Sequence, residues 1–440
     1  MNYAAAVGEL QRRGRFRISL GLARIERLLD ELDHPERALR GALVAGTNGK
    51  GSVVALVTAA LHAAGVRTGS MPSPHLVTYR ERIAVDGTPI SEPRFATAVE
   101  RVMPAVDAVA TTLGEPTEFE LLTAAAVAEF TAARVDAAIV EVGMGGRLDA
   151  TNALDLGVAA ITNVQHDHER HLGRSLRAIA VEKAAIVKRG DLAVTGARGS
   201  GFTVVSERCA ALDVPLRRAG GSSADYRTTV RHTGWDGVVV DLARPSGELG
   251  ALRIGLLGRH QADNAAVAVA ILDALGERFG GRLRTDERAV RRGFAVARWP
   301  GRLEVVTPSR GVRVVLDGAH NPAGCAVLRR ALEELGVRRP AIVFGAIRGK
   351  RVTAMLRTLA ALEPTPVFTS VPEANAIPTE RLAATWRRLT GRRARVREAP
   401  VEAMALAADL APADTPVVVC GSLYLVGAVR RALVGDGAAA

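Results

Sequence analysis

The fold is decided by a stretch that reads GALVAGTNGKGS over residues 41–52 and continues into the helix-compatible run 53–64. Residues 41–44 form a short apolar run, so the order is strand, glycine-rich loop, helix. Such a loop lets backbone N–H groups approach phosphate oxygens, while the positive end of the helix faces them and Lys50 reaches the terminal phosphates. The stretch departs from the usual GxxxxGK[ST] pattern because a glycine separates the lysine from the serine. It predicts nucleotide binding through Gly46, Thr47, Asn48, Gly49, Lys50, Gly51 and Ser52, and a turn without a ligand is the less favoured alternative.

The same alternation continues beyond this loop. Apolar runs at 135–142, 157–164 and 192–195 are separated by helical stretches such as 123–133 and 176–187. Strands that alternate with helices predict a parallel sheet covered on both faces. Residues 225–254 differ, because short alternating strands around a Gly-Trp-Asp-Gly turn at 234–237 indicate an antiparallel ribbon before a helix that starts near Gln261.

A second alternating series follows a break near residues 297–302, where Pro300 and Gly301 interrupt the pattern. We therefore expect two domains, residues 1–296 and residues 297–440. Strands are expected at 312–316, 341–344, 367–369 and 416–420, and helices at 323–335, 352–362, 379–389 and 401–410. The predicted fold class is α/β: a P-loop-type, mostly parallel sheet domain with helices on both faces, followed by a smaller Rossmann-like α/β domain.

Composition narrows the class of protein. A chain of 440 residues suggests two or three domains. Its 48% hydrophobic and 24% charged residues are typical of a soluble globular protein, and no apolar run is long enough to span a bilayer. The start lacks the layout of a secretory signal, so we expect a cytoplasmic protein without a membrane partner. Cys209, Cys325 and Cys420 are widely spaced, which favours buried free thiols over disulfides or structural zinc.

The charge balance raises a second class of function. The formal net charge is +12, from 58 basic and 46 acidic residues, and basic groups that neutralise phosphates drive nucleic-acid binding. However, the basic residues are scattered and aromatic residues are only 4%. We expect small-molecule substrates and no nucleic-acid partner. A P-loop ATPase stimulated by nucleic acid is the function that this charge balance would favour.

Lysine is rare in this chain, which otherwise uses arginine for positive charge. The four lysines are Lys50, Lys183, Lys188 and Lys350. Lysine has a compact ammonium that can be deprotonated and modified, whereas arginine cannot be deprotonated in proteins. A lysine can therefore persist where a guanidinium cannot substitute, and chance survival is the alternative.

Two further segments carry residues of metal-binding type. Glu141 ends an apolar strand beside the phosphate loop, a position where magnesium is held, although a strand-end glutamate in a solvated turn is equally compatible with the pattern. His166, His168 and His171 suggest zinc at first sight, but one imidazole in a magnesium or manganese shell fits better beside a phosphate loop. Lys183 follows on a helix, where a solvated surface position is the alternative to a functional one.

Taken together, the motifs resemble those of the dihydrofolate synthase/folylpolyglutamate synthase family, within the Mur ligase superfamily. They occur in the family's order and cover nearly the whole chain. The matching segments are residues 46–52, 73–76, 81–83, 141–152, 167–168, 182–184, 301–302, 317–322 and 421–425.

The resemblance implies an ATP-dependent ligase that adds L-glutamate to dihydropteroate and to folates. ATP phosphorylates the acceptor carboxylate to an acyl phosphate, because carboxylate oxygen is a poor leaving group. The glutamate amine then attacks, and phosphate leaves. Divalent metal and cations offset the charge gathered by the triphosphate and the carboxylate. A Mur-type amide ligase or a paralogue with a different carboxylate acceptor is the alternative within this class, and the run 149–152 favours the folate branch.

The resemblance also implies roles for individual residues. Lys50, Lys183 and His168 are the expected catalytic residues, with Lys183 carbamylated, and Ser73, Glu141 and His168 are expected to hold Mg²⁺, with two magnesium sites in all. Beyond the phosphate loop, ATP contacts are expected from Asn264, Arg302, Asp317 and His320. The acceptor pocket is expected to comprise Ile18, Ser19, Leu20, Phe119, Asp149, Ala150, Thr151 and Asn152. A monomer is the default for this architecture.

Overall fold

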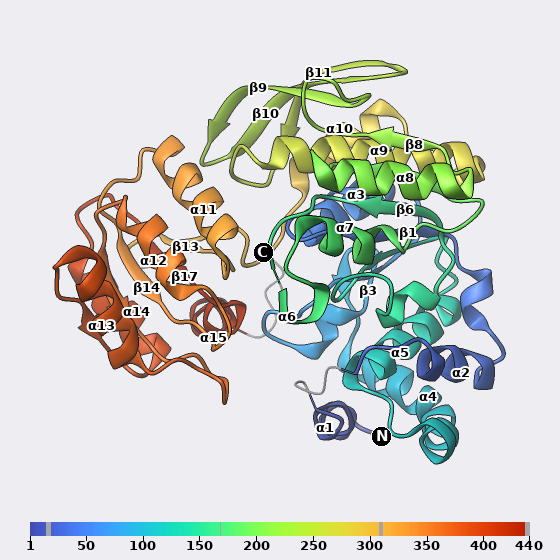
Figure 1. The fold of residues 1–440 in the computed structure, drawn as a ribbon, viewed down its shortest axis with the longest axis horizontal. Coiled ribbons are helices and arrows are strands. Elements are labelled where there is room, and N and C mark those ends of the chain that lie inside the picture. The colour runs from blue at the N-terminus through green and yellow to red at the C-terminus, as the bar shows by residue number, and fades with distance from the viewer. Residues whose placement is uncertain (15–18, 168, 308–310, 436–440) are drawn as a thin grey trace.

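The computed structural model describes residues 1–14, 19–167, 169–307 and 311–435 (Figure 1). Its larger part is built on an eight-stranded sheet in the order β4-β3-β2-β5-β1-β6-β7-β8. The strands from β2 to β8 in this order are parallel, and β3 and β4 add an antiparallel edge. The bounds are β1 (Gly41–Ala45), β2 (Thr68–Met71), β3 (Ala84–Val85), β4 (Thr88–Pro89), β5 (Ala137–Glu141), β6 (Gly157–Ile161), β7 (Leu192–Thr195) and β8 (Leu216–Arg218).

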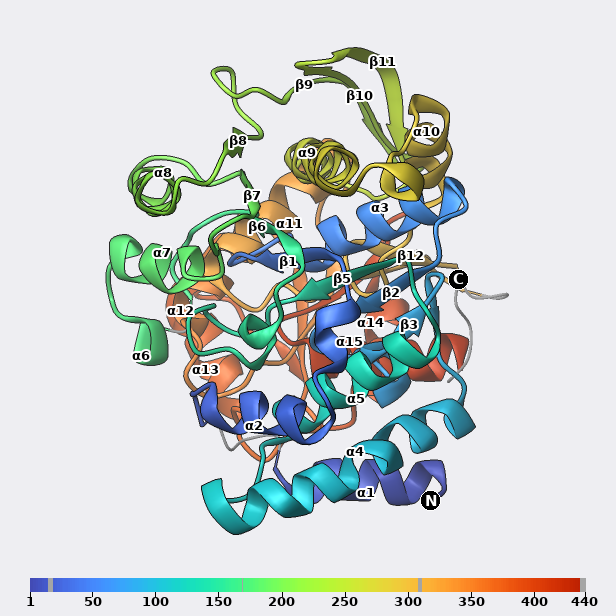
Figure 2. The same cartoon turned by 90° about the vertical axis from the view of Figure 1, so that its right-hand side faces the viewer.

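Helices cover both faces of this sheet, as Figures 1 and 2 show from two sides. In β1, Leu43 and Ala45 join the apolar cluster on one face, while Ala42 and Val44 join the cluster on the other. Successive strand side chains point to opposite faces, so a strand covered on both sides is apolar throughout. One face packs against α1 (Tyr3–Arg12), α2 (Ala23–Glu31), α4 (Glu92–Leu113), α5 (Glu118–Ala132), α7 (Leu176–Ala184) and α8 (Ser200–Leu212), and the other against α3 (Lys50–Ala63), α9 (Gln261–Phe279) and α10 (Glu287–Val296).

The predicted antiparallel ribbon is confirmed. It consists of β9 (Arg227–Gly234), β10 (Gly237–Arg244) and β11 (Gly247–Ile254), paired in the order β11-β10-β9. Its apolar side chains, among them Val238 and Leu252, are buried in the cluster formed with α9 and α10. At its tip, the guanidinium of Arg313 lies 4.7 Å from the ring centroid of Trp235, so the ribbon also contacts the smaller part of the molecule.

The smaller part is a six-stranded sheet in the order β12-β13-β17-β14-β15-β16, shown in orange and red in Figure 1. Only the β12–β13 pair is antiparallel within this sheet of described residues. Its strands are β12 (Glu304–Val306), β13 (Val314–Leu316), β14 (Ala341–Phe344), β15 (Thr365–Phe368), β16 (Arg395–Val396) and β17 (Val417–Cys420). Helices α11 (Pro322–Glu334), α12 (Val352–Ala360) and α13 (Thr379–Thr390) pack on one face, and α14 (Pro400–Leu410) and α15 (Leu423–Val434) on the other.

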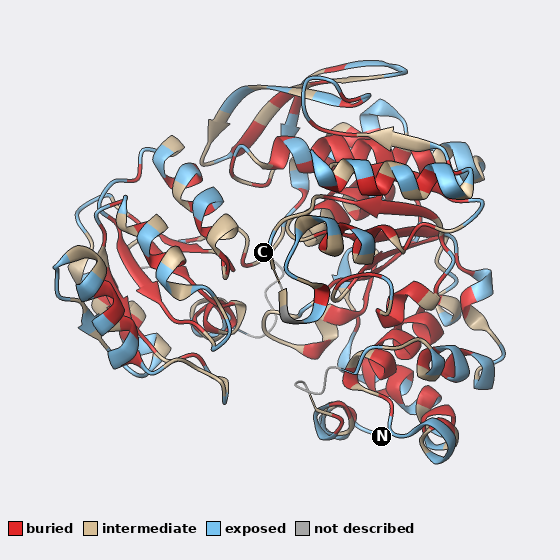
Figure 3. Cartoon of the chain, in the orientation of Figure 1, coloured by how far each residue is buried: buried red, intermediate tan, exposed pale blue. Residues whose placement is uncertain are grey.

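These sheets confirm the predicted fold class. Figure 3 shows the buried strands at the centre of each part, with exposed residues on the outer helix surfaces. All three cysteines are buried free thiols, as predicted. The chain crosses between the sheets after α10 ends at Val296 and before β12 begins at Glu304. The division into residues 1–296 and 297–440 stays a prediction.

Element boundaries differ from the expectations in places. Helix α5 begins at Glu118, earlier than residue 123, because Thr117 and Glu120 form a capping box at its start. Helix α7 ends at Ala184, and the expected strand 157–164 ends at Ile161, which leaves residues 162–164 free to contact the phosphate loop. The remaining short elements are α6 (Glu169–Leu172) and the 3-10 helices Pro35–Ala38, Tyr79–Arg82, Ala150–Ala153 and Gly281–Leu283. No helix among the described residues is both long enough and apolar enough to span a membrane.

Candidate active site

A cavity of about 760 Å³ opens where the carboxyl ends of the large parallel sheet face the smaller part of the molecule. Ligands of open α/β sheets bind outside the carboxyl ends of the strands, so this is the expected place for a site. The cavity brings together most of the residues predicted from the sequence. Those that line it are Ser19, Leu20, Gly46, Thr47, Asn48, Gly49, Lys50, Gly51, Ser52, Ser73, Phe119, Glu141, Asp149, Ala150, Lys183, Asn264, Arg302, Asp317 and His320.

The phosphate loop joins β1 to α3. Gly49 caps the helix with φ of +83°, a left-handed conformation that favours glycine, and Asn264 approaches it so closely that a side chain there would overlap the amide. Lys50 begins the helix, and its Nζ donates to the carbonyl oxygen of Gly46 at 3.2 Å. The loop backbone therefore lines the cavity, and the N-terminus of α3 lies directly after it.

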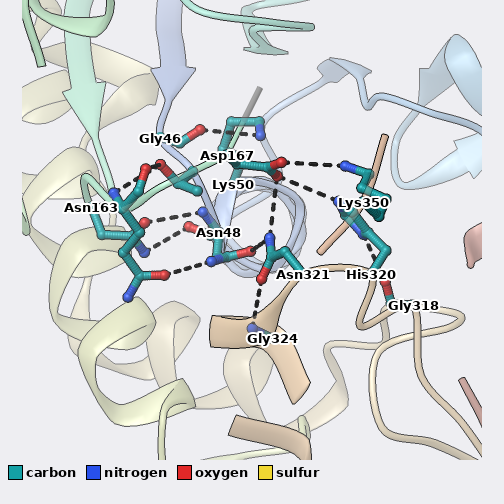
Figure 4. A network of polar contacts seen from close by, with 12 residues as sticks. Gly46, Asn48, Lys50, Asn163, Asp167, Gly318, His320, Asn321, Gly324 and Lys350 are labelled. Atoms are coloured by element: carbon teal, nitrogen blue, oxygen red, sulfur yellow. Dashed lines mark hydrogen bonds and ion pairs between the residues drawn. The ribbon is translucent and has the colours of Figure 1, made fainter. Parts of the chain in front are cut away.

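Residues just after β6 hold this loop in place, as Figure 4 shows. The backbone N–H of Asn48 donates to Oδ1 of Asn163 at 3.0 Å, and the Asn163 amide donates back to the Asn48 carbonyl at 2.8 Å. The hydroxyl of Thr162 donates to the same carbonyl at 2.7 Å, and the Asn48 amide donates to Oε1 of Gln165 at 2.7 Å. A loop whose polar groups are satisfied from a neighbouring strand is preorganised before any ligand arrives.

Glu141 ends β5 and is 4% exposed. Burial raises the pKa of its carboxyl, which the charge of Lys50 and a backbone hydrogen bond from Ser73 partly oppose. Ser73 N–H donates to Oε2 of Glu141 at 3.1 Å, and Nζ of Lys50 lies 3.7 Å from Oε1. A carboxylate whose burial disfavours its charged form gains from a cation beside it.

Glu141 and Ser73 fit the magnesium expectation by chemistry. They offer a carboxylate and a hydroxyl, the oxygen donors that Mg²⁺ prefers, next to a loop suited to phosphates. Ser73 is held from its other side by Arg82, whose Nη1 donates to the Ser73 hydroxyl at 2.8 Å. The third predicted ligand, His168, lies outside the described residues.

Lys183 sits on α7 and is 4% exposed, so the solvated-surface alternative is wrong. Its Nζ donates to the carbonyl oxygen of Gly46 at 2.9 Å, the same oxygen that accepts from Lys50. Burial, followed by the positive charge of Lys50, lowers the pKa of Lys183 to about 7. A substantial fraction of this lysine is therefore a neutral amine near neutral pH, which is the nucleophilic form.

The opposite side of the cavity comes from the connection and the start of the six-stranded sheet. Asp317 follows β13 and accepts backbone hydrogen bonds from Leu303 at 2.8 Å and from Ala319 at 2.9 Å. Burial raises the pKa of Asp317, and the nearby Arg302 opposes that shift. The His320 ring bonds the Gly318 carbonyl through Nδ1 at 2.9 Å. These groups face the phosphate loop across the cavity.

Polar contacts to one carboxylate join the two parts of the molecule (Figure 4). Asp167, from the segment after β6, accepts from Nζ of Lys350 at 3.2 Å and from Nδ2 of Asn321 at 3.1 Å. Nε2 of His320 lies 3.5 Å from the same carboxylate, and the Asn321 amide also contacts Oδ1 of Asn48 at 3.5 Å. Side chains that the six-stranded part presents to the large sheet thus border the cavity beside the phosphate loop.

The acceptor end of the cavity lies around Phe119 and Asp149. The Phe119 ring packs on Gly143, where an added Cβ would lie 2.8 Å from the ring. Burial raises the pKa of Asp149, and hydrogen bonds from Thr151 oppose that shift most strongly. Asp149 accepts from the Thr151 hydroxyl at 2.6 Å and from the Met144 N–H at 2.8 Å. The Asp149 carboxylate thus holds its own loop in shape, and the Phe119 ring offers a flat apolar surface of the kind on which a planar heterocycle packs.

The remaining predictions for this end divide into two groups. Thr151 and Asn152 are buried and do not line the cavity; they contact its wall from behind. Ile18 lies outside the described residues, whereas Ser19 lines the cavity and its hydroxyl accepts from Arg24 at 3.0 Å. Each residue's role stays a prediction.

The roles of several cavity residues were not predicted from the sequence. Asn163 and Gln165 accept hydrogen bonds from Asn48 of the phosphate loop. Both are polar residues directly after an apolar strand, a pattern that indicates a position at the edge of the site. Arg82 is 8% exposed and donates to both Ser73 and His75; it lies in the matching segment 81–83, but its contacts do not follow from that segment alone. The pairing of Asp167 with Lys350 had no local signal, because the residues are far apart in the chain.

Comparison with protein families gives two matches. Residues 44–272 match the Mur ligase middle domain, and residues 301–423 match the Mur ligase, glutamate ligase domain. The first match covers more than half of the chain and includes the phosphate loop, Glu141 and Lys183. The second includes Arg302, Asp317 and His320.

Individual relatives point the same way. The dihydrofolate synthase/folylpolyglutamate synthase of Bacillus subtilis (strain 168) is 35% identical over 374 residues, which cover 81% of this chain and 82% of the relative. The Mycobacterium tuberculosis folylpolyglutamate synthase complexed with ADP and AMPPCP superposes with a TM-score of 0.90 at 34% identity, over 98% of this chain and 100% of that one. E. coli FolC in complex with DHPP and ADP gives a TM-score of 0.84 at 27% identity, over 98% and 97%. The chain therefore belongs to the Mur ligase family, among the dihydrofolate synthases/folylpolyglutamate synthases.

Proposed function

We propose that this protein is an ATP-dependent ligase that adds L-glutamate to dihydropteroate and to folates through an acyl phosphate. The observation that carries the proposal is the cavity itself. It combines a braced phosphate loop, the buried Glu141 and Lys183, and a ring-and-carboxylate pocket formed by Phe119 and Asp149. The membership of the chain in the dihydrofolate synthase/folylpolyglutamate synthases supports the same reaction.

Each part of the cavity has a task in this reaction. Backbone N–H groups of the phosphate loop and Nζ of Lys50 would bind the β- and γ-phosphates of ATP, which lie at the positive end of α3. Arg302 and Asp317 would hold the nucleotide from the other side. The acceptor would lie with its ring toward Phe119 and Asp149 and its carboxylate toward the γ-phosphate. Transfer to that carboxylate turns a poor leaving group into phosphate.

Ser73, Glu141 and His168 would hold Mg²⁺, with a second ion near the phosphates. Bound magnesium would offset the negative charge of the triphosphate and the acceptor carboxylate. Ser73 and Glu141 are already joined by a hydrogen bond, and Lys50 beside Glu141 supplies a positive charge in the same place.

Lys183 would act as a carbamate. Carbamylation needs a neutral amine, and burial lowers the pKa of Lys183 to about 7. The modified group would carry a negative charge next to Lys50, which replaces a like-charge repulsion by an attraction. An arginine at this position keeps a positive charge and cannot be modified in this way.

Closure of the cavity would protect the acyl phosphate from water. Asp167 receives donors from Lys350, Asn321 and His320, so the two parts of the molecule meet beside the phosphate loop. Exclusion of water by such closure is a recognised means of preventing hydrolysis of a reactive intermediate. We expect the protein to act in the cytoplasm as a monomer on small-molecule substrates.

The test is a coupled assay with purified protein, ATP, Mg²⁺, L-glutamate and either dihydropteroate or tetrahydrofolate. Released phosphate is measured and products are identified by mass spectrometry. Glutamylated product from both acceptors establishes the proposed function in full, and product from one acceptor assigns a single branch. The variant Lys50→Met, which loses the ammonium beside Glu141, is the control for contaminating activity.

The same assay separates the alternatives. Phosphate release that needs DNA or RNA and ignores glutamate would support a nucleic-acid-stimulated ATPase instead. No product with either folate acceptor, under conditions in which a known ligase works, would shift the assignment to a different carboxylate acceptor. In that case the pocket around Phe119 and Asp149 is the region to probe.

A further inference from the structure

Lys188 is a rare lysine whose ammonium lies behind the acceptor end of the cavity. Its Nζ donates to Oδ1 of Asn152 at 3.1 Å and to the carbonyl oxygen of Leu154 at 3.0 Å. Asn152 and Leu154 belong to the segment that follows Asp149, and both are buried. Two hydrogen bonds from one ammonium thus fix both the side chain and the backbone of this segment.

The position of Lys188 is itself fixed. Its backbone N–H donates to Oδ2 of Asp191 at 2.8 Å, and Asp191 is 4% exposed. The carboxylates of Asp191 and Asp155 attract the ammonium, while the Arg208 guanidinium repels it. Because the ammonium is partly buried and hydrogen-bonded to two oxygens, its removal has a larger effect than removal of a surface charge.

The segment held by Lys188 forms one wall of the acceptor pocket. Leu148, Asp149 and Ala150 line the cavity, whereas Asn152 and Lys188 lie behind this lining. Asn152 also holds the start of this wall, because its amide donates at 3.1 Å to the carbonyl of Arg147, which directly precedes the lining residues. Lys188 therefore acts on the pocket through Asn152 and does not touch the acceptor.

The same chain segment carries the reaction centre. Lys183 lies at the end of α7, a few residues before Lys188, and its Nζ reaches the phosphate loop at Gly46. Directly before Lys183, the carbonyl of Glu182 accepts from the Arg147 N–H at 2.9 Å. The segment from Glu182 to Lys188 thus contacts the acceptor wall at both ends.

We propose that Lys188 is a positioning residue for the acceptor: it holds the Asp149–Asn152 wall at a set distance from the helix that bears Lys183. This inference rests on the proposed function, because it takes Asp149 and Ala150 as lining residues of the acceptor pocket. It explains why a lysine persists there in a chain rich in arginine. An ammonium donates to two oxygens from one atom, whereas the broad planar guanidinium needs a wider site.

The test compares Lys188→Met, Lys188→Arg and the neighbouring control Arg189→Met, whose side chain is exposed. For Lys188→Met we expect KM for the acceptor to rise about tenfold, as for loss of hydrogen bonds from a charged group. KM for ATP and kcat should stay within about twofold of wild type, since the phosphate loop is untouched. The KM of Lys188→Arg for the acceptor should lie between those of Lys188→Met and wild type. The KM of Arg189→Met for the acceptor should equal that of wild type.

Acceptor binding gives a second measurement. Calorimetric titration of dihydropteroate in the presence of ADP and Mg²⁺ should show the same tenfold weakening for Lys188→Met, at an unchanged affinity for ADP. A Lys188→Met protein with wild-type KM and affinity for the acceptor overturns the inference. So does a variant in which acceptor and ATP constants worsen equally, because that outcome indicates general destabilisation. If Lys188→Met does not fold, Lys188→Arg decides by the same two criteria.

The control with wild-type protein separates this inference from the function on which it rests. Wild type that forms no glutamylated product overturns the proposed function, and the role of Lys188 falls with it. Active wild type with an unaffected Lys188→Met overturns the inference alone.

Discussion

The two walls of the active-site cavity are built in different ways. The loop wall, made of Gly46, Lys50, Glu141 and Lys183, comes from the ends of adjacent parallel strands and the helix beside them. Gly46, Glu141 and Lys183 are buried and Lys50 is half-buried, and the carbonyl oxygen of Gly46 accepts from both lysines. The closing wall, made of Asp317, His320, Asn321 and Lys350, comes from the six-stranded part and meets the loop wall chiefly at Asp167.

This difference implies that the reactive groups and the groups that close the cavity are held in place in different ways. The loop wall is part of a sheet buried on both faces, so its geometry is fixed by the core and does not depend on a ligand. The closing wall meets Asp167 through the half-buried side chains of Lys350 and His320 and through the buried Asn321. Because these polar contacts join two separately packed sheets, we expect substrate-dependent motion at the closing wall and reactive groups that stay fixed on the loop wall.

The largest effect is expected from Lys183→Arg, which places a permanent positive charge in the loop wall. We expect kcat to fall at least about a hundredfold, the scale seen when a preorganised polar group is lost from an active site. The reason is that arginine can be neither neutral nor carbamylated, and that its guanidinium does not fit the buried site at Gly46. Initial rates of glutamylation measure the loss. A Lys183→Arg enzyme with wild-type rates would remove carbamylation from the mechanism.

The second effect concerns the stability of the same wall. The pKa of Lys183 falls from about 10.5 in the unfolded chain to about 7 in the folded protein. Between these values the unfolded state binds more protons, so stability contributed at this site rises with pH and is lost as pH falls toward 7. Relative to that of Lys183→Met, the free energy of unfolding of the wild-type protein should increase by about 2 kcal/mol between pH 7.5 and 9. Denaturant unfolding in carbonate-free buffer measures this free energy at each pH. If the free energy of unfolding depends on pH in the same way for both proteins, the lowered pKa of Lys183 is contradicted.

The third effect tests the closing wall. Asp167→Asn and Lys350→Met should each lower kcat/KM about tenfold, and the double variant should be no worse than Asp167→Asn, because both remove one interaction. The exposed pair Arg339–Glu363, 3.1 Å apart, is the matched control, and its variants should have no effect. Independent, fully additive losses at Asp167 and Lys350 would show that the contact does not close the cavity.

The smallest effect is expected at the junction of the walls. A Cβ at Gly51 would lie 2.5 Å from the Trp299 ring of the connection between the sheets. Gly51→Ala should therefore raise KM for ATP roughly fivefold by displacing Trp299, and Gly51→Ala with Trp299→Leu should recover most of the loss. Gly8→Ala, in a helix with open space at that position, is the control. If Trp299→Leu gives no recovery, the effect lies in the loop and not at the junction.

The loop wall was largely predictable from the sequence, and the closing wall was not. A strand, a glycine loop and a helix are adjacent in the chain, and the carboxyl ends of parallel strands share one edge, so Lys50 and Glu141 could be placed together. The burial of Lys183 was not readable, because its partner Gly46 lies on a distant segment. The contacts of Asp167 link residues that follow different sheets, and no local pattern indicates which polar groups meet across such an interface.

The acceptor pocket lies between these extremes. Phe119, Asp149 and Ala150 were predicted through resemblance and do line the cavity. Thr151 and Asn152 were predicted with them, yet they support the wall from behind. A motif identifies a segment, but which of its side chains face the substrate depends on packing that the motif does not encode.

The most direct test of the account follows one oxygen atom. The acceptor is prepared with ¹⁸O in its reacting carboxylate and incubated with ATP, Mg²⁺, L-glutamate and enzyme, and the released phosphate is analysed by mass spectrometry. If the loop wall transfers the γ-phosphate to that carboxylate, one ¹⁸O atom appears in phosphate for each amide bond formed. Glutamylated product accompanied by unlabelled phosphate would contradict the acyl phosphate, and with it the role assigned to the loop wall.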